Sequence, residues 1–170
     1  MSWVLTRRLL IMSCALAMPL VATAEQPSVK VEPPQLGGSR ALEKQTEAAV
    51  IRDYLQSWES FRTALNENGA GLLDPDFVGT ARDKLAETIA QQIKLGIHTR
   101  YGDLSHDLQF VFYSPEGQSI QLIDTVEYDE QVLEGNKALT TQRVKARYLV
   151  VLTPAEVRWR VRILQAEPER

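Results

Sequence analysis

Apolar and polar residues alternate with a period of two through most of residues 105–165, a pattern that predicts antiparallel strands joined by hairpins. The first turn is predicted at Ser114–Gln118, where Pro115 presets φ for a type I turn and Gly117 supplies the left-handed residue that closes a three-residue loop. Counting outward from this turn gives the register of the first hairpin, which pairs Phe112 with Ile120, Phe110 with Leu122, Leu108 with Asp124 and His106 with Val126.

Two further hairpins are predicted, with turns at residues 134–138 and 153–156. In the middle hairpin we pair Glu134 with Ala138, because this register sets acidic residues opposite basic ones, whereas a shift by one residue would bury carboxylates. The resulting charge pairs are Glu127 with Lys145 and Asp129 with Arg143. The last hairpin is predicted to pair Leu152 with Val157, Val150 with Trp159, Tyr148 with Val161 and Ala146 with Ile163.

The three registers agree on one apolar face of the sheet, which we expect to cover the core. The residues assigned to this face are Leu108, Phe110, Phe112, Ile120, Leu122, Val126, Tyr128, Ala146, Tyr148, Val150, Leu152, Val157, Trp159, Val161 and Ile163. Asp124 is the single charged residue among them, which makes it the first candidate for a functional side chain.

Two helices are predicted before the hairpins. The first is capped by Ser39 and has apolar residues at three- and four-residue steps, namely Leu42, Ala49, Val50, Tyr54, Trp58, Phe61 and Leu65. The second is capped by Thr80, ends near Gly96 and carries the stripe Leu85, Ala86, Ile89, Ala90 and Ile93. With a short edge strand at residues 97–101, this order predicts one α+β domain over residues 39–167, in which both helices pack on a curved antiparallel sheet of four to five strands.

Residues 1–24 have the order of a secretory signal peptide, because Arg7 and Arg8 precede an apolar run that ends in Ala22-Thr23-Ala24. This run is shorter than the ~20 residues of a membrane-spanning helix, so we expect cleavage before Glu25 and no stable membrane span afterwards; a retained anchor is the alternative. Residues 25–38, rich in Pro and Gly, are expected to be a disordered lead-in. The protein is therefore expected in the periplasm or outside the cell.

Cleavage also changes the charge and the cysteine content. Loss of two arginines leaves 17 of the 19 basic residues against 22 acidic ones, a net charge near −5. An acidic exported protein is a poor candidate for nucleic-acid binding. The single cysteine, Cys14, leaves with the signal peptide, so the mature chain is expected to have neither a disulfide nor a thiol nucleophile.

Three features of the chain together resemble one superfamily. They are the long first helix with Tyr54 and Trp58 one turn apart, the helix from Thr80 to Leu95, and the meander that ends at residues 157–161. In this combination, over about residues 40–165, the chain resembles the NTF2-like superfamily of cone-shaped α+β barrels. That superfamily includes ketosteroid isomerase-like and dehydratase-like enzymes, periplasmic domains of secretion machines and other pocketed proteins, so the resemblance implies a fold but no single function.

Catalytic members of such cones use an acid or base inside an apolar pocket, and Asp124 with the diagonal His106 is the candidate pair here. The resemblance implies a ligand pocket lined by aromatic residues, for which the candidates are Tyr54, Trp58, Phe110, Tyr128, Tyr148 and Trp159. The alternative is structural: Asp124 bonds a tyrosine hydroxyl or a helix amide, and His106 is partly exposed. We expect no metal site, because His98 has no ligand pattern beside it, and no cofactor.

These observations favour an exported, non-enzymatic domain that binds a small apolar ligand or a protein partner of the cell envelope. One alternative is a cofactor-free lyase or isomerase that uses Asp124 and His106. Another is a structural module of a cell-envelope assembly. The outer sheet face carries Val111, Ile123, Leu149, Val151 and Leu164 among charged residues that include Arg158 and Arg160. This mixture predicts a homodimer through this face, and the alternative is a set of ordinary scattered surface hydrophobes.

Overall fold

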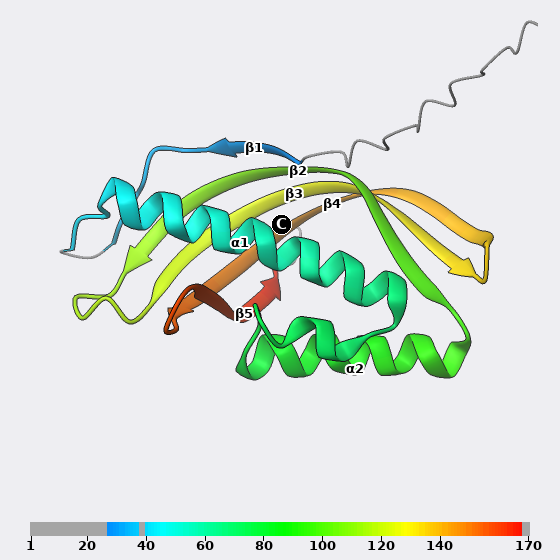
Figure 1. Cartoon of the computed structure of the whole chain (residues 1–170). Coiled ribbons are helices and arrows are strands. Elements are labelled where there is room, and N and C mark those ends of the chain that lie inside the picture. The colour runs from blue at the N-terminus through cyan, green and yellow to red at the C-terminus, as the bar shows by residue number, and fades with distance from the viewer. Residues whose placement is uncertain (1–26, 38–39, 168–170) are drawn as a thin grey trace, which may run out of the picture.

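The computed structural model describes residues 27–37 and 40–167, which form helices on one curved sheet (Figure 1). The elements in chain order are β1 (Ser28–Val31), α1 (Lys44–Glu67), the 3-10 helix η1 (Ala70–Leu73), α2 (Gly79–Leu95), β2 (His98–Tyr113), β3 (Ile120–Glu134), β4 (Lys137–Pro154) and β5 (Trp159–Ala166). The sheet has the order β1-β2-β3-β4-β5 and is antiparallel except for the parallel pair β1 and β2. The predicted α+β fold class is confirmed.

Helix α1 forms because apolar side chains recur at helical spacing and bury one stripe against the sheet. This stripe includes Val50, Tyr54, Trp58, Phe61 and Leu65. The helix begins at Lys44 with Glu43 at the N-cap position and no side-chain cap, so it starts later than predicted. Ser39, the predicted cap, lies outside the described residues.

Helix α2 starts at Gly79, again without a side-chain cap, so the predicted cap at Thr80 is wrong. Its end at Gly96 is confirmed: the residue has φ +68°, and its N–H bonds the carbonyls of Gln92 and Ile93. The predicted apolar stripe is buried at Ile89 but is 57% exposed at Ile93. The last turn of α2 therefore extends beyond the core.

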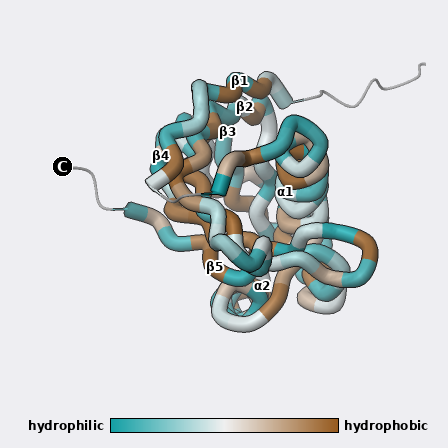
Figure 2. Tube along the Cα trace, turned by 90° about the vertical axis from the view of Figure 1, so that its left-hand side faces the viewer, coloured by the Kyte–Doolittle hydropathy of each residue, from teal (hydrophilic) through white to brown (hydrophobic). Residues whose placement is uncertain are grey.

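Both helices lie on the same face of the sheet, and the core fills the space between the two layers (Figure 1). The end-on view shows the sheet curving around α1, with apolar residues on its inner side (Figure 2). Helix α1 contacts β2 and β5, and α2 contacts mainly β5. The fully buried sheet residues of this core are Leu108, Phe110, Ile120, Leu122, Val126, Val150 and Leu152.

The predicted registers of the first two hairpins are confirmed over most of their length. Leu108 pairs with Asp124, and His106 pairs with Val126. Glu127 lies opposite Lys145, with 2.7 Å between Oε1 and Nζ, and Asp129 lies opposite Arg143 in a second ion pair. The middle turn is tighter than predicted, because Glu134 pairs with Lys137, and a bulge after Val132 restores the register.

A bulge also changes the first hairpin near its turn. Between Phe110 and Phe112 the register shifts by one residue, so Tyr113 and not Phe112 lies opposite Ile120. Tyr113 is buried and Phe112 only partly so. The left-handed conformation predicted for Gly117 is confirmed, with φ +74° and its N–H bonded to the carbonyl of Ser114 at 2.9 Å. The predicted three-residue loop is wrong, because the N–H of Ser114 bonds the carbonyl of Ser119 and the loop is one residue longer.

The predicted register of the last hairpin is wrong. Leu152 pairs with Val161 and Pro154 pairs with Trp159, so the turn is longer than expected and Val157 within it is 83% exposed. A register shift between Val151 and Leu152 moves the side chains of the C-terminal part of β5 to the opposite faces of the sheet from those predicted. As a result Ile163 lies on the outer face of the sheet, and Leu164 packs against the core. Pairing of two copies through the outer face stays a prediction.

The lead-in expected to be disordered contains a strand. Residues Ser28–Val31 form β1, and beyond it the N–H groups of Glu32, Gln35 and Gly37 donate to carbonyls of β2 at 2.8 to 2.9 Å. The backbone carbonyls at the edge of β2 are the acceptors, and the composition of residues 25–38 gives no sign of this pairing. The signal peptide predicted over residues 1–24 lies outside the described residues. Within the described part of the chain, no helix has both the length and the apolar content of a membrane span.

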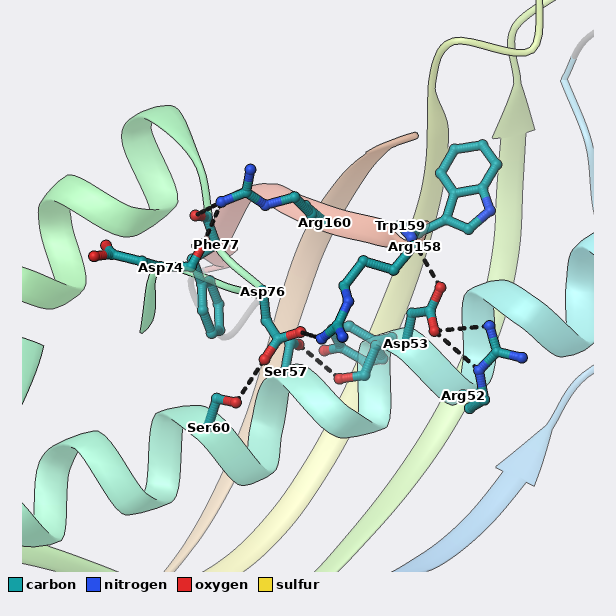
Figure 3. Close-up of polar contacts among 11 residues, drawn as sticks. Arg52, Asp53, Ser57, Ser60, Asp74, Asp76, Phe77, Arg158, Trp159 and Arg160 are labelled. Carbon is teal, nitrogen blue, oxygen red and sulfur yellow. Dashed lines mark hydrogen bonds and ion pairs between the residues drawn. The ribbon is translucent and has the colours of Figure 1, made fainter. Parts of the chain in front are cut away.

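Asp53 on α1 forms a hydrogen bond to the first residue of β5 and so connects this strand to the helical layer (Figure 3). Its Oδ2 accepts a hydrogen bond from the backbone N–H of Trp159 at 2.8 Å, and its Oδ1 lies 2.9 Å from the guanidinium of Arg52. On the same strand, Arg160 donates to the carbonyls of Asp74 and Phe77. These bonds explain the observed start of β5 at Trp159.

A second buried carboxylate, Asp76, joins β5 to the loop before α2 (Figure 3). Its Oδ1 accepts from Arg158 Nη1 at 2.8 Å, and its Oδ2 accepts from Ser60 Oγ at 2.6 Å. Its backbone carbonyl accepts from the N–H of Val161 at 2.8 Å. Because the side chain is 2% exposed and fully paired, Asp76 holds α1, β5 and the loop in one arrangement.

We predict that Asp76→Asn lowers the free energy of unfolding by about 2 to 4 kcal/mol, because it breaks a buried, charged hydrogen-bond pair with Arg158. Asp74→Asn is the matched control, since the Asp74 side chain is 59% exposed and pairs with Arg82 at the surface. We expect this control to change stability by less than about 1 kcal/mol. Denaturant unfolding of the wild type and both variants measures the difference, and equally small effects would contradict the role assigned to Asp76.

Candidate functional site

A fully buried carboxylate lies on the sheet face that α1 covers. Asp124 on β3 is 0% exposed, and its Oδ2 accepts a hydrogen bond from Tyr54 Oη at 2.7 Å and lies 2.8 Å from His106 Nδ1. Tyr54 belongs to α1 and His106 to β2, where the register places it diagonal to Asp124. We call Tyr54, His106 and Asp124 the Asp124 cluster; it joins one helix to two strands.

Three polar atoms at this cluster have no hydrogen-bond partner among the described residues. They are Asp124 Oδ1, His106 Nε2 and Trp58 Nε1. His106 is 2% exposed and Trp58 3%, so bulk water at the protein surface cannot hydrogen-bond His106 Nε2 or Trp58 Nε1. A buried polar atom without a partner costs about 1–3 kcal/mol, and native proteins keep few of them. Asp124 Oδ1 and His106 Nε2 are therefore available to a further polar group. Trp58 Nε1 approaches the Tyr54 hydroxyl without hydrogen-bond geometry and so keeps its donor available as well.

Aromatic rings pack around the cluster. The ring centroid of Trp58 lies 5.2 Å from that of His106, 5.9 Å from that of Tyr148 and 6.2 Å from that of Tyr128. Tyr101 packs against Tyr128 at 4.4 Å. These separations are typical of favourable edge-to-face and offset ring pairs. The cluster therefore lies in an apolar, low-dielectric environment, where its hydrogen bonds are stronger than in water.

The tyrosines near the cluster remain hydrogen-bond donors at neutral pH. Burial raises the pKa of Tyr54 well above its ordinary value of 10.0, and the negative charge of Asp124 raises it further. Burial is also the main cause that raises the pKa values of Tyr101, Tyr128 and Tyr148. Their hydroxyl groups are therefore protonated, and none of them supplies a phenolate base.

His106 is held in an orientation that suits proton transfer. A carboxylate can only accept hydrogen bonds, so with Asp124 ionised the proton of their bond belongs to His106 Nδ1. Neutral His106 then accepts at Nε2, and protonated His106 donates there. A carboxylate that fixes the tautomer of an imidazole is the arrangement used by general-base histidines. The cluster could thus bind a polar group or accept a proton.

The structure brings together most of the residues that the sequence singled out. His106 and Asp124 meet as their register indicated, and Tyr54, Trp58, Tyr128 and Tyr148 lie around them. The expectation that His106 is partly exposed in the structural alternative is wrong. The roles of these residues stay predictions.

Two of the proposed lining residues belong to the same hydrophobic core but, in the described part of the chain, make no ring pair with the cluster. Phe110 is fully buried in the core and Trp159 is partly buried at the start of β5, and among the described residues no ring pair joins either to the cluster. Instead, Phe61 and Tyr101 extend the aromatic group. The helical spacing of Phe61 from Trp58 could have indicated its place. Tyr101 had no such signal, because β2 was predicted to be interrupted before residue 105.

A separate open groove of about 280 Å³ lies outside the cluster, and its lining residues are Glu59, Arg62, Thr63, Asn66, Glu67, Arg100 and Tyr101. Acidic and basic side chains offset one another in it, so it has no marked preference for one charge. In the part of the chain that the structure describes, no three His, Cys, Asp or Glu side chains gather as metal ligands would.

A scan against models of known protein families finds no match, and a search of curated proteins finds none either. Among solved structures, the intermembrane-space region of the chloroplast protein ARC6 is similar, with a TM-score of 0.58 and 13% identity over 76% of this chain and 100% of that one. A scytalone dehydratase-like protein from Novosphingobium aromaticivorans has a TM-score of 0.46 and 13% identity, covering 74% and 89%. A type 2 hexachlorocyclohexane dehydrochlorinase (LinA) has a TM-score of 0.47 and 12% identity, covering 74% and 91%.

Identities this low concern the fold and not the activity. The ARC6 match covers the whole of that region. Together, the architecture and the likeness to the ARC6 region show that the chain has an NTF2-like fold.

Proposed function

We propose that this protein is an exported binding protein whose cone interior accepts a small, largely apolar molecule, and that it has no catalytic activity of its own. One observation carries the proposal: three unpartnered polar atoms, on Asp124, His106 and Trp58, lie together among buried aromatic rings. Export rests on the signal-peptide pattern of residues 1–24.

The composition of the cluster supports ligand binding over simple packing. A core that only needs to pack satisfies its buried polar atoms within the chain, as both carboxylate oxygens of Asp53 and of Asp76 are satisfied. Ligand sites instead combine apolar and aromatic walls with a few polar groups that await a partner. A bound molecule would pair the unpartnered atoms and cover the rings at the same time.

We predict that the neutral fluorophore N-phenyl-1-naphthylamine binds the wild-type protein with a rise in fluorescence. His106→Phe should weaken this binding about tenfold, because it preserves a ring of similar size but removes both nitrogens, a loss of about one hydrogen bond. His98→Phe is the matched control, because His98 lies on the same strand and makes no contact with the cluster. We expect it to bind like the wild type.

Fluorescence titration measures the affinities, and near-UV circular dichroism checks that each variant keeps its packing. Absence of binding by the wild type would overturn the proposal and would favour a structural module of a cell-envelope assembly, in which a packed interior suffices.

A second candidate, a cofactor-free lyase or isomerase, is favoured by a different observation. The 2.8 Å contact between Asp124 Oδ2 and His106 Nδ1 leaves Nε2 as the free nitrogen of an oriented imidazole. Such a histidine can remove a proton from an acidic C–H bond, and the phenols of Tyr128 and Tyr148 stay protonated and could donate to a developing oxyanion.

This candidate predicts base catalysis on a general probe. With 5-nitrobenzisoxazole, His106 Nε2 would take the ring proton as the N–O bond breaks to give a nitrile and a phenolate, which absorbance detects. His106→Gln should lower the rate about 100-fold or more, while His98→Gln should leave it unchanged. A wild-type rate equal to that of His106→Gln would exclude His106 as a base and leave the binding function alone.

A further inference from the structure

We infer that the molecule bound in the cone carries a neutral head group that both donates and accepts hydrogen bonds, such as the hydroxyl of a phenol or alcohol, and that anionic head groups are excluded. This inference rests on the proposed binding function, and it assigns the chemical class of the ligand from the charges and the hydrogen-bonding capacity of the Asp124 cluster.

The charge of the cluster excludes an anion. Asp124 has no ion-pair partner other than His106 among the described residues, and both side chains are fully buried. If His106 is neutral, the pair has a net charge of −1, and if His106 is protonated, the pair is neutral. In neither state does the pair attract a carboxylate or sulfonate, whose loss of hydration on entering a buried apolar site would cost several kcal/mol.

The unpartnered atoms define what the head group must offer. Asp124 Oδ1 can only accept a hydrogen bond, and Trp58 Nε1 can only donate one. His106 Nε2 takes either role according to its protonation. A hydroxyl donates one hydrogen bond and accepts two, so it can satisfy Oδ1 and Nε1 together. A ketone or ether offers no donor to Oδ1, and an ammonium offers no acceptor to Nε1.

The rings around these atoms indicate an apolar body behind the head group. Trp58, Tyr128, Tyr148 and Tyr101 meet at tilted or edge-to-face angles, and such surfaces accept flat apolar groups by the same ring interactions. Burial raises the pKa values of these three tyrosines, and the negative charge of Glu130 raises them further, so this charge also disfavours an anionic body.

Three probes of equal ring size test the inference: 2-naphthol, naphthalene and 2-naphthoate, each used at neutral pH to displace N-phenyl-1-naphthylamine. We expect 2-naphthol to bind about tenfold more tightly than naphthalene, as one or two added hydrogen bonds allow, and 2-naphthoate to bind more weakly than naphthalene. Naphthoate that competes as well as naphthol, or naphthol no better than naphthalene, would overturn the inference while leaving the binding function intact. Failure of N-phenyl-1-naphthylamine to bind would instead be a failure of the binding function.

Two variants separate the two parts of the argument. Trp58→Phe keeps an aromatic ring and removes the Nε1 donor. It should therefore weaken the binding of 2-naphthol about three- to tenfold and leave the affinity for naphthalene unchanged. Asp124→Asn removes the negative charge and should reduce the difference in affinity between 2-naphthoate and 2-naphthol. Glu127→Gln, on the outer face of the same strand, is the matched control for loss of one negative charge.

Thermal melts establish that each variant is folded before its affinities are compared. If Asp124→Asn does not fold, Trp58→Phe alone decides the hydrogen-bonding part. The difference in affinity between 2-naphthoate and 2-naphthol could instead shrink equally in Glu127→Gln. That result would show that surface charge, and not Asp124, weakens binding of the anion, and it would overturn the charge argument. So would a structure soaked with 2-naphthol in which only ordered water contacts the three atoms.

Discussion

The complete burial of Asp124 is the constraint on which the arrangement of this domain depends. A buried carboxylate is strongly unfavourable unless hydrogen bonds replace its lost hydration. Here those bonds come from Tyr54 on α1 and His106 on β2, so α1 can lie on the sheet only where its tyrosine reaches β3. Because Trp58 follows Tyr54 by one helical turn, the same contact brings its indole ring against His106. One polar contact thus sets the rotation of the helix and the position of the aromatic rings.

Two adjacent residues of α1, Asp53 and Tyr54, bond two different strands of the sheet. Tyr54 bonds Asp124 on β3, whereas Asp53 bonds the backbone of Trp159 on β5. Asp76 adds a third tether through Arg158 and Ser60. These buried polar contacts join segments far apart in the chain, and none requires a ligand. They explain how a chain without a described disulfide can hold its helices at a defined position over a curved sheet, with the aromatic cluster between the two layers.

The two buried polar networks differ in how completely they are satisfied. Both carboxylate oxygens of Asp53 and of Asp76 have partners, but Asp124 Oδ1 does not, and neither do the nearby nitrogens of His106 and Trp58. Unpaired buried atoms reduce stability, and a sequence selected for stability alone would readily replace them with apolar groups. Of the six such atoms among the described residues, three gather at the Asp124 cluster, and the others are Arg62 Nε, Asp107 Oδ1 and Arg160 Nε. The gathering of three at one place is the physical basis for assigning function to the Asp124 cluster. Local violations of otherwise consistent folding rules are typical of functional sites.

The sequence by itself determined the α+β class, the apolar sheet face, the registers through Glu127 and Asp129, and the diagonal approach of His106 to Asp124. It could do so because strand periodicity and cross-strand charge pairs act between residues a few positions from a turn. Only the tertiary structure decided the register of β5, the bulges and the pairing of β1. The phenol that bonds Asp124 lies 70 residues away, and the carboxylate that holds Trp159 lies 106 residues away. Contacts at such separations depend on how whole layers pack, which no local pattern records.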